Sequence, residues 1–343
     1  MKILIISHYN PETFEYGGLA TFVRNLSRGL KSLGHEVHYI SVSPTVYRKY
    51  DYVRVIPSGF RPYELDLRLH EVIKYCVDCD GIYDVVIAND YFSPCVTRKS
   101  KLIAYIHNFV GSPWELVLMA YADRVCTNSR MNKSLIDPHL KFVKELTRGW
   151  VGKEGTEEVV VLHPPPPEPP ERVEEVRGLE LNEPILCYVG RTQDYKNFNT
   201  FKKLVVELSV NGLVISHDVE SSVDVFKRGG EEVSKIVYFG NVPEEVKWGL
   251  MRKCTLGIYP SFFEPYGLVP LEFVRSGVPV VVSKNCGVVE VLEPVTFDPN
   301  NFEELVKVVK EVLKYRDDYL NELTHRPIMY RTWREFAEEL INA

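Results

Sequence analysis

The chain has 343 residues, of which 45% are hydrophobic and 26% charged, and its formal net charge is -6. This composition is typical of a globular protein long enough for two domains. No lysine- and arginine-rich run appears, so nucleic acid is not an expected partner. No stretch approaches the ~18–20 apolar residues needed to cross a bilayer, and the apolar run at residues 3–6 is too short for a signal peptide. We therefore expect a cytoplasmic protein.

The first half of the chain alternates short apolar runs with helical patterns. Residues 1–7 are rich in Ile and Leu and predict a buried strand, whereas 21–33 carries apolar residues at helical spacing. Further strands are predicted at 36–41, 85–88, 102–106 and 124–127. Asn128 or Ser129 is a candidate cap for the next helix. Such alternation implies a mostly parallel sheet with helices on both faces.

A proline-rich segment, residues 163–170, interrupts this pattern near the middle of the chain. Consecutive prolines favour an extended conformation and cannot form a helix interior, so we expect a linker between two domains here, a surface loop being the alternative. The alternation then resumes, with a helix at 202–208 and strands at 184–189, 213–216, 236–239, 255–259 and 279–282. Ligands of such sheets bind beyond the carboxyl ends of the strands, which predicts a site in the cleft between the domains.

Seven cysteines are scattered along the chain. Cys76 and Cys79 form an isolated C-x-x-C, without the second pair or histidine cluster that would complete the about four ligands of a zinc site. We interpret the cysteines as buried or idle thiols and expect no metal.

The segment 259–273, with the sequence YPSFFEPYGLVPLEF, carries the strongest functional pattern. A predicted strand ends near its start, a loop follows, and a helix is predicted to begin near Leu268. The first N–H groups of a helix lack intrahelical partners and carry positive partial charge, so they suit a phosphate. Glu264 in the loop and Glu272 in the helix are candidate acceptors for paired sugar hydroxyls. A loop anion and a solvated helix residue are the alternatives, and spacing alone does not decide between them.

Arg191 and Lys196 follow the predicted strand at 184–189. A guanidinium fork and an ammonium at the carboxyl end of a strand suit the binding of a diphosphate, although both residues would also serve as ordinary surface cations. Two weaker signals lie in the first half of the chain. Gly17 and Gly18 would let the backbone approach a ligand closely or would simply form a turn, and His107 at a strand end is either a site residue or a structural histidine.

These segments resemble the retaining glycosyltransferases of family 4, the glycosyl transferases group 1. The similarity is most specific in the second half of the chain, where Glu264 and Glu272 occupy the E-x7-E positions. The matching segments there are 189–197, 239–245, 259–282, 285–291 and 332–340. The first half matches more loosely, through Gly17-Gly18, His107 and 122–129.

The resemblance implies an α/β fold of the GT-B type, with two doubly wound Rossmann-like domains facing across a cleft. The N-terminal, acceptor-side domain would span 1–163 and be completed by a C-terminal helix at 328–343. A proline-rich linker at 164–177 would lead to a nucleotide-sugar-binding domain at 178–327.

The resemblance also implies roles for single residues. Arg191 and Lys196 would neutralise the donor diphosphate and its developing charge. Glu264 would hold the donor sugar, Glu272 the ribose, and His107 would contact the sugar from the other domain. The implied catalytic residues are Glu264, His107, Arg191 and Lys196. Further donor-binding positions are Gly17, Gly18, Gly267, Leu268 and Val269.

The implied reaction is the transfer of a hexose from a nucleotide-diphosphate sugar to an acceptor, with retained anomeric configuration and without a metal or other cofactor. No nucleophile is clearly placed on the far face of the sugar, which favours a same-face substitution. The acceptor would be a glycan, a lipid-linked sugar or a small sugar. Peripheral membrane contact and the oligomeric state stay open.

Two alternatives are another GT-B nucleotide-sugar enzyme, such as an epimerase, and a non-catalytic nucleotide-sugar-binding protein. The paired glutamates argue against the first alternative. The complete set of Arg191, Lys196, Glu264 and Glu272 argues against the second.

Overall fold

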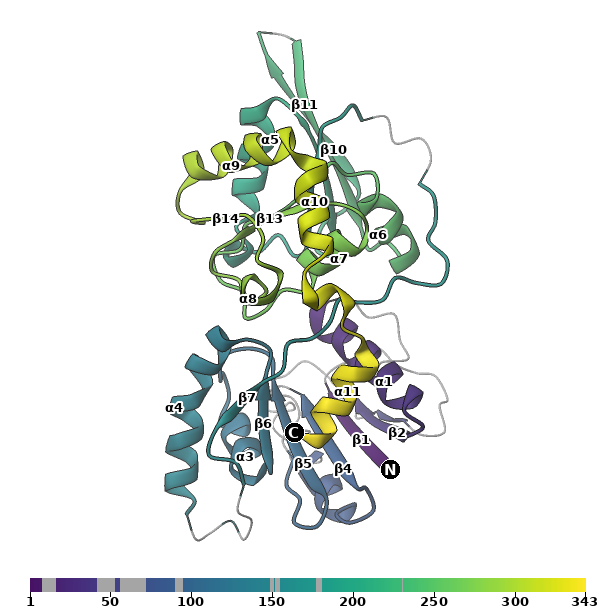
Figure 1. Cartoon of the computed structure of the whole chain (residues 1–343), viewed down its shortest axis with the longest axis vertical. Coiled ribbons are helices and arrows are strands. Elements are labelled where there is room, and N and C mark those ends of the chain that lie inside the picture. Colours follow the sequence, from purple (N-terminus) through teal and green to yellow (C-terminus); the bar gives the residue numbers. More distant parts are fainter. Residues whose placement is uncertain are drawn as a thin grey trace. The chain divides into compact units, whose positions relative to one another are not determined.

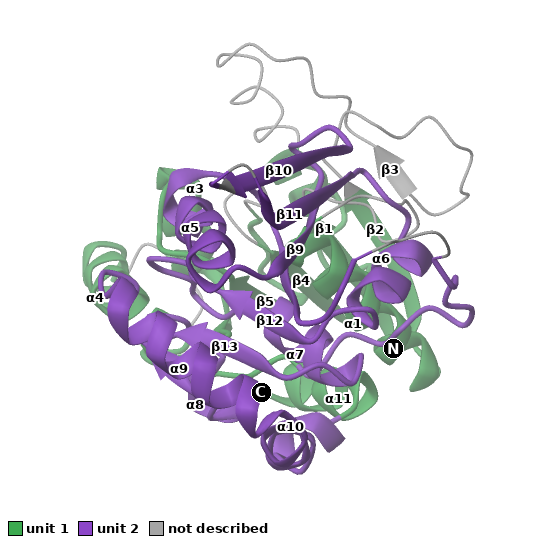
Figure 2. Cartoon of the chain, turned by 90° about the horizontal axis from the view of Figure 1, so that it is seen from above, with its two compact units in different colours: residues 1–164, 332–343 green, residues 165–331 purple. Residues whose placement is uncertain are grey.

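The structure is a computed structural model that describes residues 1–7, 17–41, 53–55, 72–89, 95–148, 151, 155–176, 181–229 and 231–343. The chain forms two compact units, coloured separately in Figure 2. Unit 1 comprises Met1–Pro164 and Thr332–Ala343, and unit 2 comprises Pro165–Arg331. Among the residues described, one seven-stranded sheet lies in each unit.

The sheet of unit 1 is parallel throughout, in the order β3-β2-β1-β4-β5-β6-β7. This is the Rossmann strand order with one further strand. The sequence order of the strands falls from β3 to β1 and then rises from β4, so the switch point lies between β1 and β4. The strands are β1 (Lys2–Ser7), β2 (Glu36–Ser41), β3 (Val53–Val55), β4 (Val85–Asn89), β5 (Lys101–Ile106), β6 (Arg124–Thr127) and β7 (Val159–Val161). The strand predictions for this half are confirmed to within one residue, because β1, β4 and β5 are nearly continuous buried apolar runs.

Four helices of unit 1 are α1 (Gly18–Ser32), α3 (Pro113–Tyr121), α4 (Arg130–Leu146) and α11 (Trp333–Asn342), seen in Figure 1. The prediction that the first helix begins at residue 21 is wrong by one turn. Gly17 is the N-cap of α1, so Gly17 and Gly18 begin this helix. Ser129 is the cap of α4, since its hydroxyl accepts a hydrogen bond from the Asn132 N–H at 3.0 Å.

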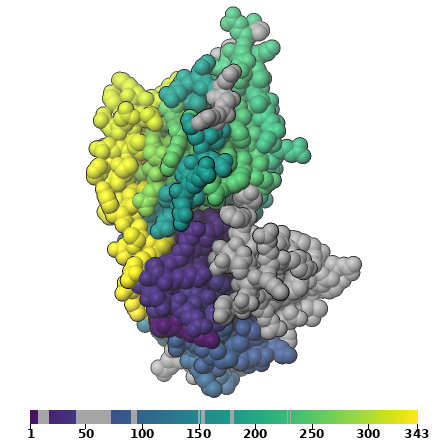
Figure 3. All heavy atoms as spheres, turned by 90° about the vertical axis from the view of Figure 1, so that its right-hand side faces the viewer, coloured from purple at the N-terminus to yellow at the C-terminus, as the bar shows by residue number. Residues whose placement is uncertain are grey.

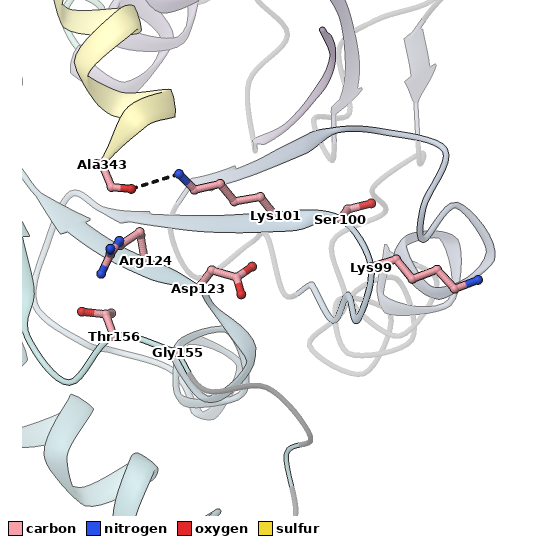
Figure 4. Close-up of a pocket in the computed structure, with 8 residues that line it drawn as sticks. All are labelled: Lys99, Ser100, Lys101, Asp123, Arg124, Gly155, Thr156 and Ala343. Carbon is pink, nitrogen blue, oxygen red and sulfur yellow. Dashed lines mark hydrogen bonds between the residues drawn. The ribbon is translucent and has the colours of Figure 1, made fainter.

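The C-terminal helix α11 packs against α1 within unit 1. A Cβ atom at Gly29 would lie 2.3 Å from the Trp333 carbonyl oxygen, so only glycine permits this close approach. At the end of α11, Lys101 Nζ donates to backbone oxygens of Ile341 and Ala343, each at 2.9 Å. Figure 4 shows the bond to Ala343. A lysine beside the last carbonyls of a helix stabilises that end.

The sheet of unit 2 has the order β10-β11-β9-β8-β12-β13-β14 and is parallel except for the β10–β11 pair. Without β10, the strands repeat the Rossmann order, and the switch point in that order lies between β8 and β12. The strands are β8 (Ile185–Val189), β9 (Asn211–Ser216), β10 (Ser222–Arg228), β11 (Glu231–Gly240), β12 (Leu256–Tyr259), β13 (Val280–Ser283) and β14 (Thr296–Phe297). The β10–β11 hairpin extends beyond the rest of unit 2 (Figures 1 and 3).

The helices of unit 2 are η1 (Asp194–Lys196), α5 (Phe198–Leu208), α6 (Glu244–Met251), α7 (Val269–Arg275), α8 (Val289–Leu292), α9 (Phe302–Lys314), α10 (Arg316–Thr324) and η2 (Pro327–Tyr330). The proline-rich segment leads into this unit, and the residues that follow it lie against α6. The Glu174 N–H donates to the Glu245 carbonyl at 3.1 Å, and a Cβ atom at Gly249 would meet the Glu174 carbonyl at 1.9 Å. Residues 165–176 therefore belong structurally to unit 2.

Candidate functional site

A cluster of three side chains lies at the carboxyl ends of β8 and β12, the neighbouring strands between which the order of the sheet reverses. Lys196, the last residue of η1, forms an ion pair with Glu264. The Tyr259 hydroxyl donates to Glu264 Oε2 at 3.0 Å and lies 3.4 Å from Lys196 Nζ. Lys196 was predicted to bind the diphosphate and Glu264 the sugar. In the structure the two side chains also form an ion pair with each other.

The loop that carries Glu264 is held on both sides by backbone hydrogen bonds. The Glu264 N–H donates to the Asn285 carbonyl and the Gly287 N–H donates to the Glu264 carbonyl, both at 3.0 Å. The Phe262 N–H donates to the carbonyl of Tyr195, in η1, at 2.9 Å. The Glu264 backbone is therefore fixed from two directions, which limits the movement of its carboxylate.

Gly267 permits this arrangement because its φ is +95°, in the region that L side chains rarely adopt. A Cβ atom there would lie 3.1 Å from the Tyr259 ring and 3.3 Å from Glu264 Cγ. Helix α7 begins two residues later, at Val269, and no side chain caps it. Within the described part of the chain no acceptor meets the N–H of Leu268 or Val269, which suits an anion.

Glu272, on α7, is buried, with only 4% of its side chain exposed. Its Oε1 lies 3.0 Å from Nζ of Lys247 on α6, and the same ammonium lies 2.8 Å from Glu244 Oε2. The alternative reading of Glu272 as a solvated helix residue is therefore wrong. Lys247 was not predicted as a site residue, because a single lysine beside Trp248 in a short helix forms no recognisable sequence pattern.

Arg191 follows Gly190 at the end of β8, where the Tyr188 hydroxyl donates to its carbonyl oxygen. Within the described residues its guanidinium forms no ion pair. Burial and the nearby Arg191 charge lower the pKa of His217. The neighbouring Asp218 carboxylate accepts from the Thr192 N–H at 2.9 Å. Arg191 is therefore a cation available to a ligand at the same edge of the sheet as Lys196.

His107 follows β5 in unit 1 and packs against aromatic rings. Its ring centroid lies 4.4 Å from that of Phe22, edge to face, and 4.7 Å from that of Tyr105. Nε2 lies 3.3 Å from Asn89 Oδ1. Burial lowers the pKa of His107 to about 3, so the imidazole is neutral at pH 7. Contact with a sugar stays a prediction for His107.

Gly17 and Gly18 lie elsewhere in unit 1, at the start of α1. Gly17 has a φ of +120°, and a Cβ atom on either glycine would meet nothing within 4 Å. The positive φ at Gly17 needs glycine, whereas no steric contact among the described residues requires one at Gly18.

Comparison with known proteins assigns the chain to a family. The family model described as Glycosyl transferases group 1 matches residues 171–330, and the one described as Glycosyltransferase Family 4 matches residues 16–145. The two matches cover the cluster around Lys196 and Glu264 as well as His107. The chain belongs to the group 1 glycosyltransferases.

Curated relatives of this glycosyltransferase match over limited segments. An uncharacterized glycosyltransferase of Methanocaldococcus jannaschii is 28% identical over 115 residues, which are 32% of this chain and 30% of the relative. The alpha-1,3/1,6-mannosyltransferase of Neurospora crassa is 37% identical over 83 residues, 23% of this chain and 18% of the relative. O-antigen chain mannosyltransferase B of Escherichia coli is 32% identical over 114 residues, 32% of this chain and 29% of the relative. The matches thus span less than a third of these relatives.

Solved structures match over the whole glycosyltransferase chain. Sucrose-phosphate synthase from Thermosynechococcus elongatus has a TM-score of 0.71 at 16% identity, covering 99% of this chain and 97% of the other. The catalytic domain of starch synthase IV from Arabidopsis thaliana has a TM-score of 0.69 at 11% identity, covering 100% and 99%. At this identity the likeness shows the fold alone, and it confirms the prediction of an α/β fold of the GT-B type.

A separate hollow of about 480 Å³ lies at the amino ends of β5 and β6 (Figure 4). Its lining consists of Lys99, Ser100, Lys101, Asp123, Arg124, Gly155, Thr156 and Ala343. None of the predicted site residues of the glycosyltransferase lines it. Among the described residues, no helix is both long and apolar enough to span a membrane.

Proposed function

We propose that the protein is a retaining, metal-independent hexosyltransferase that uses a nucleotide-diphosphate sugar and a sugar or glycan acceptor. The Lys196–Glu264–Tyr259 cluster supports this most directly. It lies at the point where ligands of doubly wound sheets bind, and it combines a cation for phosphate with a carboxylate for hydroxyls. Two curated relatives are named as mannosyltransferases, so mannose is the first hexose to test.

In the proposed reaction, Arg191 and Lys196 stabilise the leaving diphosphate. Negative charge grows on the diphosphate as its bond to sugar C1 breaks, and fixed cations stabilise that charge in the transition state. The N–H groups of Leu268 and Val269 bind the distal phosphate at the start of α7. These cations and N–H groups take the place of a divalent metal.

Glu264 orients the donor sugar by accepting hydrogen bonds from its hydroxyls. The ion pair with Lys196 and the hydrogen bond from Tyr259 hold the carboxylate before the sugar arrives, which reduces the reorganisation needed in the reaction. His107, neutral at pH 7, contributes a hydrogen bond to the sugar instead of a charge.

The acceptor oxygen attacks C1 on the face from which the diphosphate leaves. A bond forms between the acceptor oxygen and C1 while the bond between C1 and the phosphate oxygen breaks. The acceptor's proton passes to the departing phosphate oxygen, so the step needs no enzyme nucleophile and the anomeric configuration is retained.

The donor site is tested by thermal unfolding with UDP, GDP and ADP in the presence of EDTA. A ligand at a hundred times its Kd stabilises the folded state by about 2.7 kcal/mol, which raises the Tm by about 5–10 °C for a unit of this size. Lys196→Ala is expected to lose most of this rise. Lys235→Ala is the matched control, because Lys235 forms an exposed ion pair with Glu232 on β11 and should keep the full rise.

The same protein is then incubated with the matching nucleotide-mannose and with simple mannosides in EDTA, and the product linkage is determined by NMR. We expect turnover and an anomeric configuration equal to that of the donor. Absence of any nucleotide-induced rise in Tm would contradict the donor site. Activity lost in EDTA and restored by a divalent ion would contradict the metal-free step, and an inverted product would contradict retention.

A further inference from the structure

Lys247 lies in a buried group of three charges that the proposed reaction does not use. Its ammonium is 3.0 Å from Glu272 Oε1 and 2.8 Å from Glu244 Oε2. The Lys247 side chain is 12% exposed, the Glu272 side chain 4% and the Glu244 side chain 22%. Glu244 and Lys247 belong to α6, whereas Glu272 belongs to α7, so the lysine joins the two helices.

A buried charge is unfavourable unless it is paired, because it loses its hydration. Glu244, one helical turn from Lys247, already supplies a partner within α6. The contact with Glu272 is therefore not needed to give Lys247 a partner of opposite charge. Burial alone would lower the pKa of Lys247, but the carboxylates of Glu272 and Glu244 outweigh burial and raise it. Lys247 stays charged throughout the neutral pH range.

The charged ammonium has two effects on Glu272. It favours the ionised form of the carboxylate, which accepts hydrogen bonds and donates none. It also fixes the direction of the side chain, because Oε1 is held at hydrogen-bond distance. A carboxylate oxygen can accept two hydrogen bonds, so the bond to Lys247 leaves Oε1 able to accept another from a hydroxyl.

We propose that Lys247 is a positioning residue for ribose recognition: it holds the Glu272 carboxylate in the orientation that accepts hydrogen bonds from the ribose hydroxyls of the donor nucleotide. This inference rests on the proposed function, in which Glu272 binds the ribose. Lys247 itself touches neither the sugar nor the diphosphate. It acts on the selectivity of the site for ribonucleotides.

The test compares the affinities of a ribonucleoside diphosphate and its 2′-deoxy counterpart, measured by calorimetry for whichever of UDP, GDP and ADP binds. We expect the wild type to prefer the ribonucleotide by about tenfold or more, as for a hydrogen bond to a charged group. Lys247→Met is expected to reduce the preference to within about threefold, mainly by weakening binding of the ribonucleotide. Glu272→Gln should reduce it similarly, and the double variant should show no further loss.

Glu244→Gln is the matched control, because it removes the other partner of Lys247 and leaves the contact with Glu272 in place. It is expected to keep the tenfold preference. Lys247→Arg provides a second variant if Lys247→Met does not fold, since it retains the charge but displaces the donor. The preference of Lys247→Arg for the ribonucleotide is expected to fall, while its Tm stays near that of the wild type.

The outcomes separate this inference from the function on which it rests. Equal weakening of both nucleotides in Lys247→Met or Lys247→Arg, with an unchanged ratio, would show a purely structural role and overturn the inference alone. A wild type that binds both nucleotides equally would overturn the ribose contact and the inference together. A wild type that binds no nucleoside diphosphate would overturn the proposed function as well.

Discussion

Gly267 offers a direct test of how the cluster at β8 and β12 is built. In Gly267→Ala the new methyl group would meet the Tyr259 ring at 3.1 Å and Glu264 Cγ at 3.3 Å, on a backbone with a φ of +95°. A left-handed conformation costs a non-glycine residue about 1–2 kcal/mol. Crowding in a packed region adds about 1–3 kcal/mol. We expect the free energy of unfolding to fall by about 2–5 kcal/mol.

Gly277→Ala is the matched control for the backbone contribution. Gly277 follows the same helix α7 with a φ of +79°, and a Cβ atom there would meet nothing within 4 Å. This variant should lose only the about 1–2 kcal/mol of the backbone term. The difference between the two variants therefore measures the crowding of Tyr259 and Glu264.

Both variants are measured by urea unfolding and then by the rise in Tm that a nucleoside diphosphate produces. Gly267→Ala should also reduce the ligand-induced rise, because its methyl group displaces the carboxylate and hydroxyl that hold Lys196. Gly277→Ala should keep the rise. If the two variants lose equal stability and bind nucleotide equally, the close packing at Gly267 does not control the cluster and the reasoning fails.

Two buried titratable groups in unit 1 predict pH effects of opposite sign. Burial lowers the pKa of His107 to about 3, so its contribution to stability is present above the unfolded pKa of about 6.5 and is lost as the pH falls towards 3. His107→Phe should flatten the decrease in unfolding free energy between pH 6.5 and 4, and an unchanged slope would contradict a buried neutral imidazole. Burial raises the pKa of Glu115 to about 7, so its contribution is present below the unfolded pKa of about 4.5 and is lost as the pH rises through 7. Glu115→Gln should therefore gain stability relative to the wild type at pH 8 and little at pH 5, and equal effects at both pH values would show that Glu115 does not titrate in this range.

Most strands of the two described sheets were predictable because a strand buried on both faces is an apolar run, whereas β3, β7, β10 and β14 were not predicted. β5 and β8 are examples, with five consecutive fully buried residues each. β10 was missed for the opposite reason. It is an antiparallel edge strand, and the exposed Val223 and Val225 lie on either side of the charged Asp224. Such a pattern does not separate an edge strand from a polar loop.

The pairing of site residues was not predictable from the sequence. Lys196 and Glu264 are 68 positions apart, and Lys247 and Glu272 are 25 apart. Spacing along the chain cannot show which cation meets which anion when the residues lie in different elements. The E-x7-E pattern identified both glutamates as candidate sugar-binding residues but indicated a partner for neither.

These pairings bear on how the proposed donor site would attract a diphosphate. Each glutamate of the E-x7-E pair is bonded to a lysine from another element, Lys196 of η1 or Lys247 of α6. The Lys196–Glu264 pair nearly cancels as a source of long-range charge, since it holds one positive and one negative group, whereas Lys247 with Glu272 and Glu244 leaves one net negative charge. In the proposed function, the attraction for a diphosphate would then come mainly from Arg191 and the uncapped start of α7. Lys196 would contribute once the ligand is close enough to compete with Glu264 for its ammonium. The arrival of the diphosphate would then be linked to the orientation of the carboxylate proposed to hold the sugar.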